Sequence, residues 1–350
     1  KPHVGTDKLI QVVRSLREEI QDLGGEFRFY TKMTGILTRE EGESGRHVQA
    51  VEMEAVNKPG EKEILKTDLL ILAIGHSARD TFAMLESQKF PMEAKSFAVG
   101  VRVQHPQAMI DASQYGECAK PETVRALPAA AYKLTANLDN GRGGYTFCMC
   151  PGGFIVPAMT RSGESVVNGM SPSGRNSVYA NSGIVTEIRP EDFAHLHAAH
   201  GELAGLRFQQ QLEELAYAQV GDRQVAPGQR LADFVRGTAS KTLPKCSYVP
   251  GVAPTEVHRW LPPFISGALR GGFAAFDRKM RGFLTNEALV VGVESRTSSP
   301  VRVPRDPDTL MHPRVQGLFP SGEGAGYAGG IISAAMDGER CAERVAEYVK

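Results

Sequence analysis

Five glycines occur within nine residues, between positions 322 and 330, and a helical pattern follows them. Because glycine has no Cβ atom, such a stretch lets a ligand approach the backbone closely. The helix that follows offers free N–H groups and the positive end of its dipole, which favour an anionic or electron-rich ligand group. The alternative is a strand-to-helix connection without a ligand, but a single glycine is enough for that. We therefore predict a ligand site at this turn.

The same stretch matches the pattern G-x-G-x-x-G. A dinucleotide-binding fingerprint also needs a second strand and an acidic residue about 20 positions further on, which holds the ribose. The residues after Gly329 instead follow one helical pattern, so we do not interpret the chain as an NAD-dependent Rossmann dehydrogenase. Glu323 lies at the start of the turn and can accept hydrogen bonds from ligand hydroxyls. The predicted ligand contacts of the turn are Gly322, Glu323, Gly324, Gly326, Gly329, Gly330 and Ile331.

A second constraint comes from residues 67–75, which are apolar on both sides of a strand pattern. Such a run is typical of a strand covered on both faces in a parallel sheet. It ends at Gly75, and ligands of open α/β sheets lie beyond such carboxyl ends, so Gly75 is also a predicted contact. Strands are predicted at 26–30, 36–39, 48–55, 67–75 and 288–293, the second and third separated by a polar turn at 40–46.

Helices are predicted at both ends of the chain. The first is capped by Thr6 or Asp7 and ends at the glycines after Leu23. In the last helix, Gly338 predicts a close approach to a neighbouring backbone. Each helix carries apolar residues on one face, as in helices that pack against a core. These are Leu9, Val13, Leu16, Ile20 and Leu23 in the first helix, and Ile331, Ala335, Gly338, Ala342, Val345 and Val349 in the last.

The middle of the chain has a different sequence pattern, in which short β-like runs alternate with glycine and proline. No internal repeat appears at a fixed period. We interpret this region, 81–285, as an inserted α+β domain that divides another domain into 1–80 and 286–350. Within it we predict strands at 97–103, 144–149, 154–159 and 165–168, and helices at 208–219, 231–235 and 265–283.

Composition narrows the functional classes. Lys plus Arg and Asp plus Glu each number 40, so the net charge is zero, which argues against nucleic-acid binding by bulk electrostatics. No apolar run reaches the roughly 18 residues of a membrane-spanning helix. Five cysteines in 350 residues do not fit a disulfide scaffold and predict a reducing, cytoplasmic location. The sequence gives no indication of the oligomeric state.

Several motifs resemble those of flavoproteins. Residues 67–75 are similar to the strand before the Ala-Thr-Gly-type turn of glutathione-reductase-like flavoproteins, and residues 317–323 resemble their late strand and Gly-Asp motif. A closer resemblance is to bacterial FAD-dependent dehydrogenases with a domain inserted into the FAD fold, and it covers nearly the whole chain. The matching segments are 1–7, 148–153, 168–171, 296–300 and 322–338.

The resemblance implies an α/β fold: a partial FAD/NAD(P)-binding, Rossmann-like domain that is split by the inserted α+β domain. It also implies that Glu323 contacts the ribityl chain of FAD, with Glu in place of the usual Asp, and that Gly329 to Ile331 lie near the flavin. Members of this group begin with a strand, a G-x-G-x-x-G turn and a helix, and no such unit precedes Lys1. The resemblance therefore implies a truncated chain that, alone, binds FAD weakly or not at all and is inactive.

Three candidate catalytic residues lie in the predicted insertion: Cys148, Cys150 and Asn168. The C-x-C spacing brings two thiols close together, and a redox role beside the flavin is one interpretation. The other is that both cysteines pack as small apolar side chains. Asn168 is a candidate through the resemblance alone. No second cysteine pair has a spacing that predicts a zinc site, so we predict no metal.

Arg296, Thr297 and Ser298 follow the apolar strand at 288–293. Arginine together with hydroxyl groups can hold a phosphate, a carboxylate or the pyrimidine oxygens of a flavin. A capped, solvated turn is the alternative, and the residues alone do not decide between the two.

We therefore expect the C-terminal portion of an FAD-dependent oxidoreductase or dehydrogenase that transfers hydride through FAD to an unidentified small molecule. The alternative is a non-catalytic scaffold with a flavoprotein fold, whose inserted domain binds a protein or RNA partner. The neutral charge disfavours RNA.

Overall fold

The computed structural model describes residues 3–41, 45–116, 127–138, 141–221 and 224–350. The chain forms two compact units, each assembled from three segments. We call them the sheet unit (1–24, 98–188 and 209–297) and the glycine-turn unit (25–97, 189–208 and 298–350). Two boundaries between the units lie near 97 and 297, whereas the predicted domain boundaries lie at 80 and 285. The predicted domains therefore stay a prediction.

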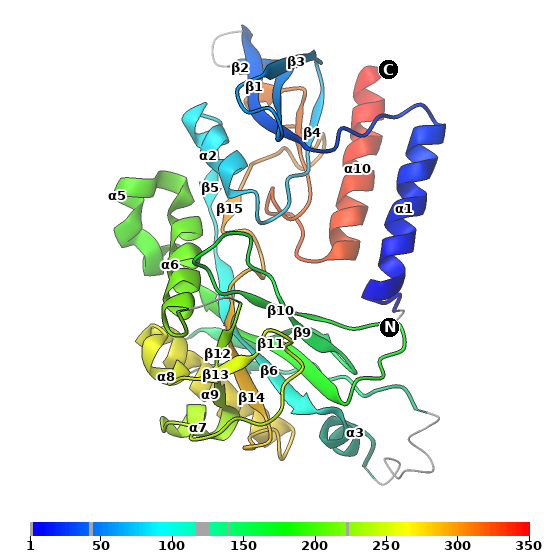
Figure 1. The fold of residues 1–350 in the computed structure, drawn as a ribbon. Coiled ribbons are helices and arrows are strands. Elements are labelled where there is room, and N and C mark those ends of the chain that lie inside the picture. Colours follow the sequence, from blue (N-terminus) through cyan, green and yellow to red (C-terminus); the bar gives the residue numbers. More distant parts are fainter. Residues whose placement is uncertain (1–2, 42–44, 117–126, 139–140, 222–223) are drawn as a thin grey trace. The chain divides into compact units, whose positions relative to one another are not determined.

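The sheet unit is built on a seven-stranded mixed sheet with the strand order β13-β12-β14-β6-β11-β8-β7 (Figure 1). The β12–β13 pair is parallel, whereas β12–β14, β14–β6, β11–β8 and β7–β8 are antiparallel. A two-stranded antiparallel hairpin, β9–β10, belongs to the same unit. The strands are β6 Phe97–Pro106, β7 Thr135–Asn137, β8 Gly143–Cys150, β9 Phe154–Pro157, β10 Val167–Met170, β11 Tyr179–Ile188, β12 Ala226–Arg230, β13 Val252–Pro254 and β14 Leu289–Glu294.

Strands β6 and β14 lie in the middle of this sheet and are buried along almost their whole length. Both strands were predicted from continuous apolar runs, at 97–103 and 288–293. Strands β8, β9 and β10 overlap the strands predicted at 144–149, 154–159 and 165–168, so these predictions are confirmed. Helix α9 packs against β7, β8 and β11. The described helices between β6 and β14 are α3 Gln107–Tyr115, α5 His197–His200, α6 Ala204–Ala218, α7 Leu231–Arg236, α8 Val257–Trp260 and α9 Pro263–Lys279, with 3₁₀ turns at Pro190–Leu196 and Gly201–Leu203.

The first helix, α1 (Thr6–Asp22), forms as predicted, but neither its cap nor its packing does. Gly5 is the N-cap, and the Asp7 carboxylate accepts hydrogen bonds from the backbone N–H and hydroxyl of Ser173 at 2.7 and 2.6 Å instead of capping its own helix. No residue of α1 is buried, so the predicted packing of the apolar face is wrong within the described chain. Hydrogen bonds join the first turn of α1 to the sheet unit, from the N–H of Thr6 to the Ser171 carbonyl oxygen and from Ser173 to the Asp7 carboxylate.

The glycine-turn unit contains an antiparallel meander, β1–β2–β3, to which β16 adds in parallel beside β2. Strands β1 and β2 include the strands predicted at 36–39 and 48–55, whereas β3 was not predicted. Two short pairs complete it: β4 with β17 in parallel, and β5 with β15 antiparallel. Its core includes Phe82, Leu85, Val301, Val315 and Leu318. The elements are β1 Thr31–Glu41, β2 Gly45–Ala55, β3 Lys62–Lys66, β4 Leu70–Leu72, α2 Arg79–Ser87, β5 Glu93–Ala94, β15 Val301–Arg302, β16 Val315–Gln316, β17 Leu318–Pro320 and α10 Ile331–Val349.

Three predictions about this unit are wrong. Residues 26–30 form no strand, because they have no partner strand and Tyr30 has a positive φ of 53°. The strand predicted at 67–75 shrinks to β4, and Ile71 is 37% exposed, so it is not covered on both faces. Helix α10 forms, but its predicted apolar face is largely exposed, and no atom of the described residues lies within 4 Å of where a Cβ atom on Gly338 would be. The predicted turn at 40–46 falls partly on 42–44, outside the described residues.

Close packing of β6 on β11 generates a stability prediction. A Cβ atom on Gly100 would lie 1.9 Å from the carbonyl oxygen of Ile184, so Gly100→Ala forces two backbones apart. We expect this change to lower the free energy of unfolding by roughly 2–4 kcal/mol. Gly267→Ala, in an exposed turn of α9 with nothing within 4 Å of its Cβ position, is the matched control and should raise it by about 0.5–1 kcal/mol. Urea unfolding curves of both variants measure the difference, and equal effects would contradict the packing described.

Candidate functional site

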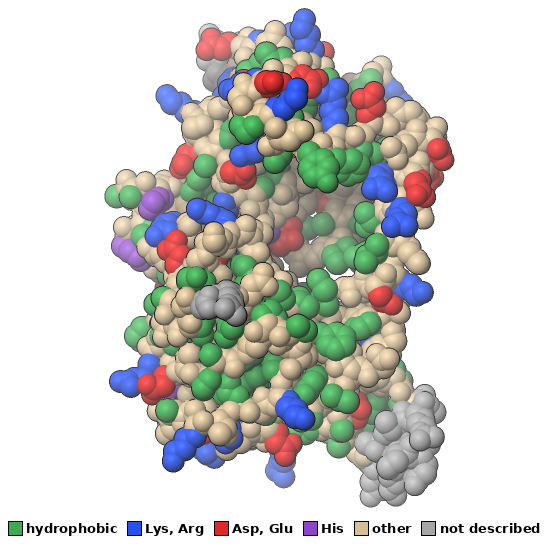
Figure 2. Space-filling view, in the orientation of Figure 1, with side chains coloured by type: hydrophobic (Ala, Val, Ile, Leu, Met, Phe, Trp, Pro, Cys, Tyr) green, Lys and Arg blue, Asp and Glu red, His purple; other side chains and the backbone are tan. Residues whose placement is uncertain are grey.

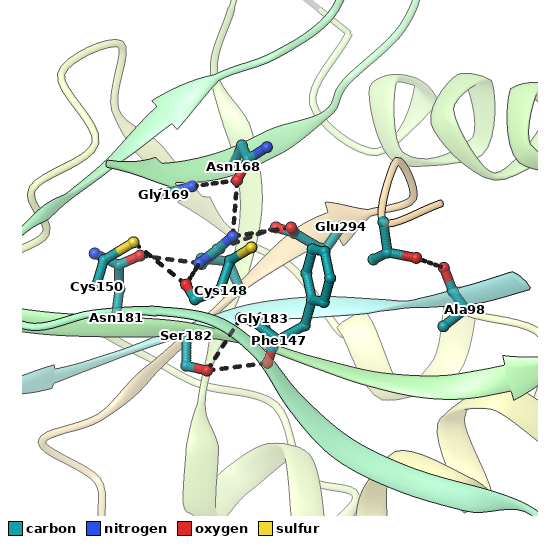
Figure 3. Close-up of polar contacts among 12 residues, drawn as sticks. Ala98, Phe147, Cys148, Cys150, Asn168, Gly169, Asn181, Ser182, Gly183 and Glu294 are labelled. Carbon is teal, nitrogen blue, oxygen red and sulfur yellow. Dashed lines mark hydrogen bonds and ion pairs between the residues drawn. The ribbon is translucent and has the colours of Figure 1, made fainter. Parts of the chain in front are cut away.

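The three candidate catalytic residues of the sheet unit lie around one buried side chain, Arg102 of β6 (Figure 3). Its Nη1 donates to the Cys148 carbonyl oxygen at 2.8 Å, and its Nη2 donates to Asn168 Oδ1 at 2.9 Å. Cys150 donates its S–H to the same carbonyl of Cys148 at 3.2 Å. The three residues therefore lie around one guanidinium, that of Arg102, which was not predicted, and their catalytic role stays a prediction.

Arg102 uses every one of its N–H donors in this arrangement. Nε and Nη2 donate to the two carboxylate oxygens of Glu294, each at 2.9 Å, and Nη1 also donates to Asn181 Oδ1 at 3.3 Å. With Cys148 and Asn168, this makes five acceptors for the five donors of a guanidinium. The five acceptor atoms belong to four residues on four different strands (β14, β11, β8 and β10), so one side chain joins the sheet to the β9–β10 hairpin.

The ion pair between Arg102 and Glu294 lies out of contact with water, since both side chains are at most 1% exposed. Burial lowers the pKa of Arg102 and raises that of Glu294, whereas each charge shifts the partner's pKa in the opposite direction. The pKa of Arg102 ends above its usual range, so the guanidinium is charged at any physiological pH. A buried pair of this kind fixes geometry more than it adds stability.

Gly169 is required where the hairpin crosses the ion pair. A Cβ atom there would lie 2.2 Å from Asn181 Oδ1 and 2.6 Å from Arg102 Nη1. The absence of a side chain lets β10 lie directly against the guanidinium, which is what brings Asn168 into hydrogen-bonding distance.

The two cysteines differ in environment. Burial raises the pKa of Cys150, despite the opposing charge of Arg102, so Cys150 is a poor nucleophile at neutral pH. Cys148 is exposed, belongs to no disulfide, and has a positive φ of 43° at a bulge in the β8–β11 pair. Such bulges redirect a side chain away from the regular sheet pattern. The glycines after Cys150 are buried as well.

Arg296 is not at a solvated turn. Its guanidinium is 6% exposed and donates to Glu213 and Glu164, each at 3.0 Å, and to Thr160 Oγ1 at 2.8 Å. Thr297 is buried too, and its hydroxyl donates to the Ala98 carbonyl oxygen at 2.6 Å. A ligand contact by Arg296 stays a prediction, and it would require exchange of these partners.

The glycine-rich turn lies in the other unit, after β17 and before α10. A Cβ atom on Gly324 would lie 2.4 Å from the Gly75 carbonyl oxygen, so the turns after the parallel strands β4 and β17 are in direct contact. Gly322 and Gly326 have φ of 73° and 85°, which other residues rarely adopt. Two predicted contacts, Gly75 and Gly324, therefore lie together as expected at the carboxyl ends of parallel strands.

Two basic residues that the sequence did not indicate accompany this turn. Burial and the nearby charge of Arg302 lower the pKa of Lys95, and burial raises the pKa of Glu323, which the charge of Lys95 opposes. The Arg302 guanidinium lies 5.3 Å from the ring centre of Tyr327. Its buried Nε has no hydrogen-bond partner among the described residues. An unpaired buried donor is unfavourable unless a ligand or water accepts from it.

The remaining predicted contacts of the turn are less enclosed. Gly329 and Ile331 are exposed, and Gly330 is half-buried at the N-cap of α10 without a side-chain cap. Ser298, the first residue of the segment 298–350 in this unit, is half-buried. No group of three or more His, Cys, Asp or Glu side chains in the described ranges could hold a metal ion. Among the same residues, no helix is long and apolar enough to cross a membrane.

A buried ion pair anchors the turn to α10. Arg305 donates to both carboxylate oxygens of Asp337, at 2.6 and 2.9 Å, and the N–H of Gly322 donates to the same carboxylate at 2.8 Å. Burial raises the pKa of Asp337, but the hydrogen bonds from Arg305 and Gly322 outweigh it and leave that pKa below its usual value of 3.8. Asp337 therefore stabilises the folded chain in its charged form.

This pair predicts a pH dependence of stability. At pH 7, Asp337→Asn should lower the free energy of unfolding by roughly 1–3 kcal/mol, because it removes the charge that Arg305 requires. Since the folded pKa of Asp337 is depressed, its contribution is complete above pH 3.8 and is lost as the pH falls through the folded value. The difference in free energy of unfolding between wild type and variant should therefore become smaller in strong acid. Glu343→Gln, on an exposed face of α10, is the control. A gap that stays constant down to pH 2 would contradict this role for Asp337.

Comparison with known proteins agrees with this architecture. The chain is 41% identical, over 99% of its length, to an "uncharacterized protein" of Clostridium beijerinckii, and it spans 62% of the length of that relative. Residues 96–297 match the family model described as FAD-dependent protein, C-terminal domain-like. The match encloses more than half of the chain, including the segments 98–188 and 209–297 of the sheet unit and the residues 189–208 of the glycine-turn unit. The chain therefore belongs to the family of FAD-dependent proteins that share this C-terminal domain.

Proposed function

We propose that this chain forms the C-terminal part of an FAD-dependent oxidoreductase that transfers hydride through FAD to a small molecule. The observation on which the proposal depends is the glycine-rich turn, closed against the end of β4 and followed by the uncapped N-terminus of α10. Free N–H groups, an unpaired Arg302 donor and the Glu323 carboxylate are the partners that an anionic ligand with hydroxyl groups requires. FAD is such a ligand, and the family description names it.

The residues of the turn fit FAD in kind. Glu323 would hold the hydroxyls of the ribityl chain, and Lys95 and Arg302 would hold negative charge of the cofactor. FAD, when bound, supplies the hydride chemistry itself, so the protein has to bind it, orient it and exclude water. Gly329, Gly330 and Ile331 would lie close to it at the start of α10. In the sheet unit, Cys148, Cys150 and Asn168 would contact the substrate.

The proposal includes a split FAD-binding domain. Residues 1–80 and 286–350 would form it, residues 81–285 would be the insertion, and a dinucleotide-binding segment would precede the chain in the whole protein. Two features of the glycine-turn unit support this. The β4–β17 pair has only three residues in each strand, and isolated two-stranded pairs are marginal in water. The apolar residues Ile331, Ile332 and Met336 of α10 are about 60–70% exposed, as expected where further chain packs.

A scaffold that binds a protein partner through the sheet unit is the second candidate. It is favoured by the full use of Arg102 and Arg296 in internal ion pairs, which leaves neither guanidinium directly available for chemistry. A flavin that no small molecule reduces would support this reading.

The visible absorption spectrum tests the cofactor. We expect a version of the protein extended at its N-terminus to be yellow after purification, and this chain alone to be colourless or to lose added FAD on a desalting column. If neither binds FAD when it is supplied, the turn is only a connection and the scaffold reading replaces the oxidoreductase.

A point substitution tests the assignment of Glu323. In the extended protein, Glu323→Ala should weaken FAD retention about tenfold, because one or two hydrogen bonds to cofactor hydroxyls are lost. Glu339→Ala, which removes an exposed carboxylate from α10, should leave retention unchanged. Flavin released after denaturation, measured per mole of protein, gives the comparison. Equal flavin content in both variants would count against Glu323 as a cofactor contact.

A further inference from the structure

We propose that Asn168 and Cys148 form a ligand site in the sheet unit that binds the carboxylate group of a small molecule, and that Arg102 is the residue that positions both. As a substrate site this inference rests on the proposed function, because it names the chemical class that the oxidoreductase would act on. As a binding site it stands on the geometry of the sheet unit alone.

The orientation of the Asn168 amide is fixed by its neighbours. A guanidinium has only donors, so the atom of Asn168 that faces Arg102 Nη2 at 2.9 Å must be the oxygen. The same oxygen accepts from the N–H of Gly169 at 2.7 Å. The amide NH₂ group therefore points away from Arg102, as Figure 3 shows for the nitrogen of Asn168. This NH₂ group has no hydrogen-bond partner among the described residues, and Asn168 is only half-buried, so its two donors are available to a ligand.

Arg102 fixes Cys148 as well. Nη1 holds the Cys148 carbonyl and Nη2 holds the Asn168 side chain, so both groups lie within the width of one guanidinium. The bulge and the positive φ of Cys148 direct its side chain to the surface, where it is exposed. The same guanidinium therefore holds the backbone of the exposed Cys148 and the side chain that carries the two N–H donors. Donors of this kind bind an anionic oxygen more strongly than a neutral one.

An apolar rim adjoins the two residues. Met170 lies two positions after Asn168 on β10 and pairs across the hairpin with Phe154 of β9. Both side chains are exposed, at 46% and 40%, and hydrophobic side chains cover this part of the molecule in Figure 2. A ligand that fits the whole surface has a carboxylate for the amide and a short apolar part for the rim.

A pair of alkylating reagents tests the site without any flavin. Iodoacetate and iodoacetamide both react when a thiolate attacks the CH₂ carbon: the C–S bond forms, the C–I bond breaks, iodide leaves and the thiol proton passes to the buffer. They differ only in that one carries a carboxylate and the other a neutral amide. The measurement is the ratio of the rates at which iodoacetate and iodoacetamide label Cys148, followed by peptide mass spectrometry. This ratio is divided by the same ratio for glutathione. We expect Cys148 to prefer iodoacetate about fivefold relative to glutathione.

Variants assign the preference to its source. Asn168→Leu removes the donors without adding charge, and should bring the ratio to that of glutathione. Asn168→Asp keeps an oxygen toward Arg102 but places a second one where the NH₂ group was, and should turn the preference toward iodoacetamide. Arg102→Lys keeps the charge but cannot hold both residues, so the preference should fall while the far-ultraviolet circular dichroism is retained. If that variant does not fold, the Asn168→Leu and Asn168→Asp variants still test whether the Asn168 amide is the source of the preference.

The inference is overturned if wild-type Cys148 shows the glutathione ratio, or if Asn168→Leu keeps the preference. Cys148→Ser, which should abolish the label at this position, checks that the signal comes from the site. Because the labelling needs no cofactor, its failure leaves the FAD proposal untouched. Conversely, a colourless extended protein would remove the redox role but not the carboxylate site.

Discussion

The five hydrogen bonds of Arg102 are the constraint around which the sheet unit is organised. A guanidinium buried in a sheet is tolerated only when each donor has an acceptor, because an unpaired buried charge is far more costly than a paired one. That requirement fixes the positions of Glu294, Asn181, Cys148 and Asn168 together. It also requires Gly169, since any side chain there would displace the pair. Thus a single ionic group determines where β10 crosses the sheet and which side chains appear beside it.

Much of the fold could be predicted from periodicity. Strands β6, β8 and β14 and helices α6, α7 and α9 follow apolar patterns that are visible in the sequence, and they form within a few residues of their predicted limits. Strand β11 was missed, although it lies near the middle of the sheet. Its Asn181, Ser182 and Gly183 break the apolar run, and they are buried because Arg102 and the backbone of β8 supply their partners. Local patterns cannot reveal polar residues whose burial depends on a partner far away in the chain.

The sequence pointed to three candidate residues of the site, but not to the interaction that holds them together. Cys148, Cys150 and Asn168 were named as candidates, yet the side chain that holds them together, Arg102, lies inside a run that resembles an ordinary apolar strand. One signal was available: a single arginine in the middle of a strand that is otherwise apolar on both faces implies a buried partner, and Glu294 ends the other long apolar strand. Lys95 and Arg302 had no such signal, because their position beside the glycine-rich turn arises from the two-residue pair β5–β15.

The segment that matches the family model has neighbouring ends. It begins at β6 and ends just after β14, which are adjacent in the sheet, and the Thr297 hydroxyl donates to the Ala98 carbonyl oxygen at this point. Adjacent ends let a domain be inserted into a loop of another without distortion of either. The ligand groups of Asn168 and Cys148 depend on bonds inside the unit, whereas Glu323 and the glycine-rich turn depend on Arg305 and Asp337 in the other. Each proposed site is therefore positioned by a buried ion pair of its own unit.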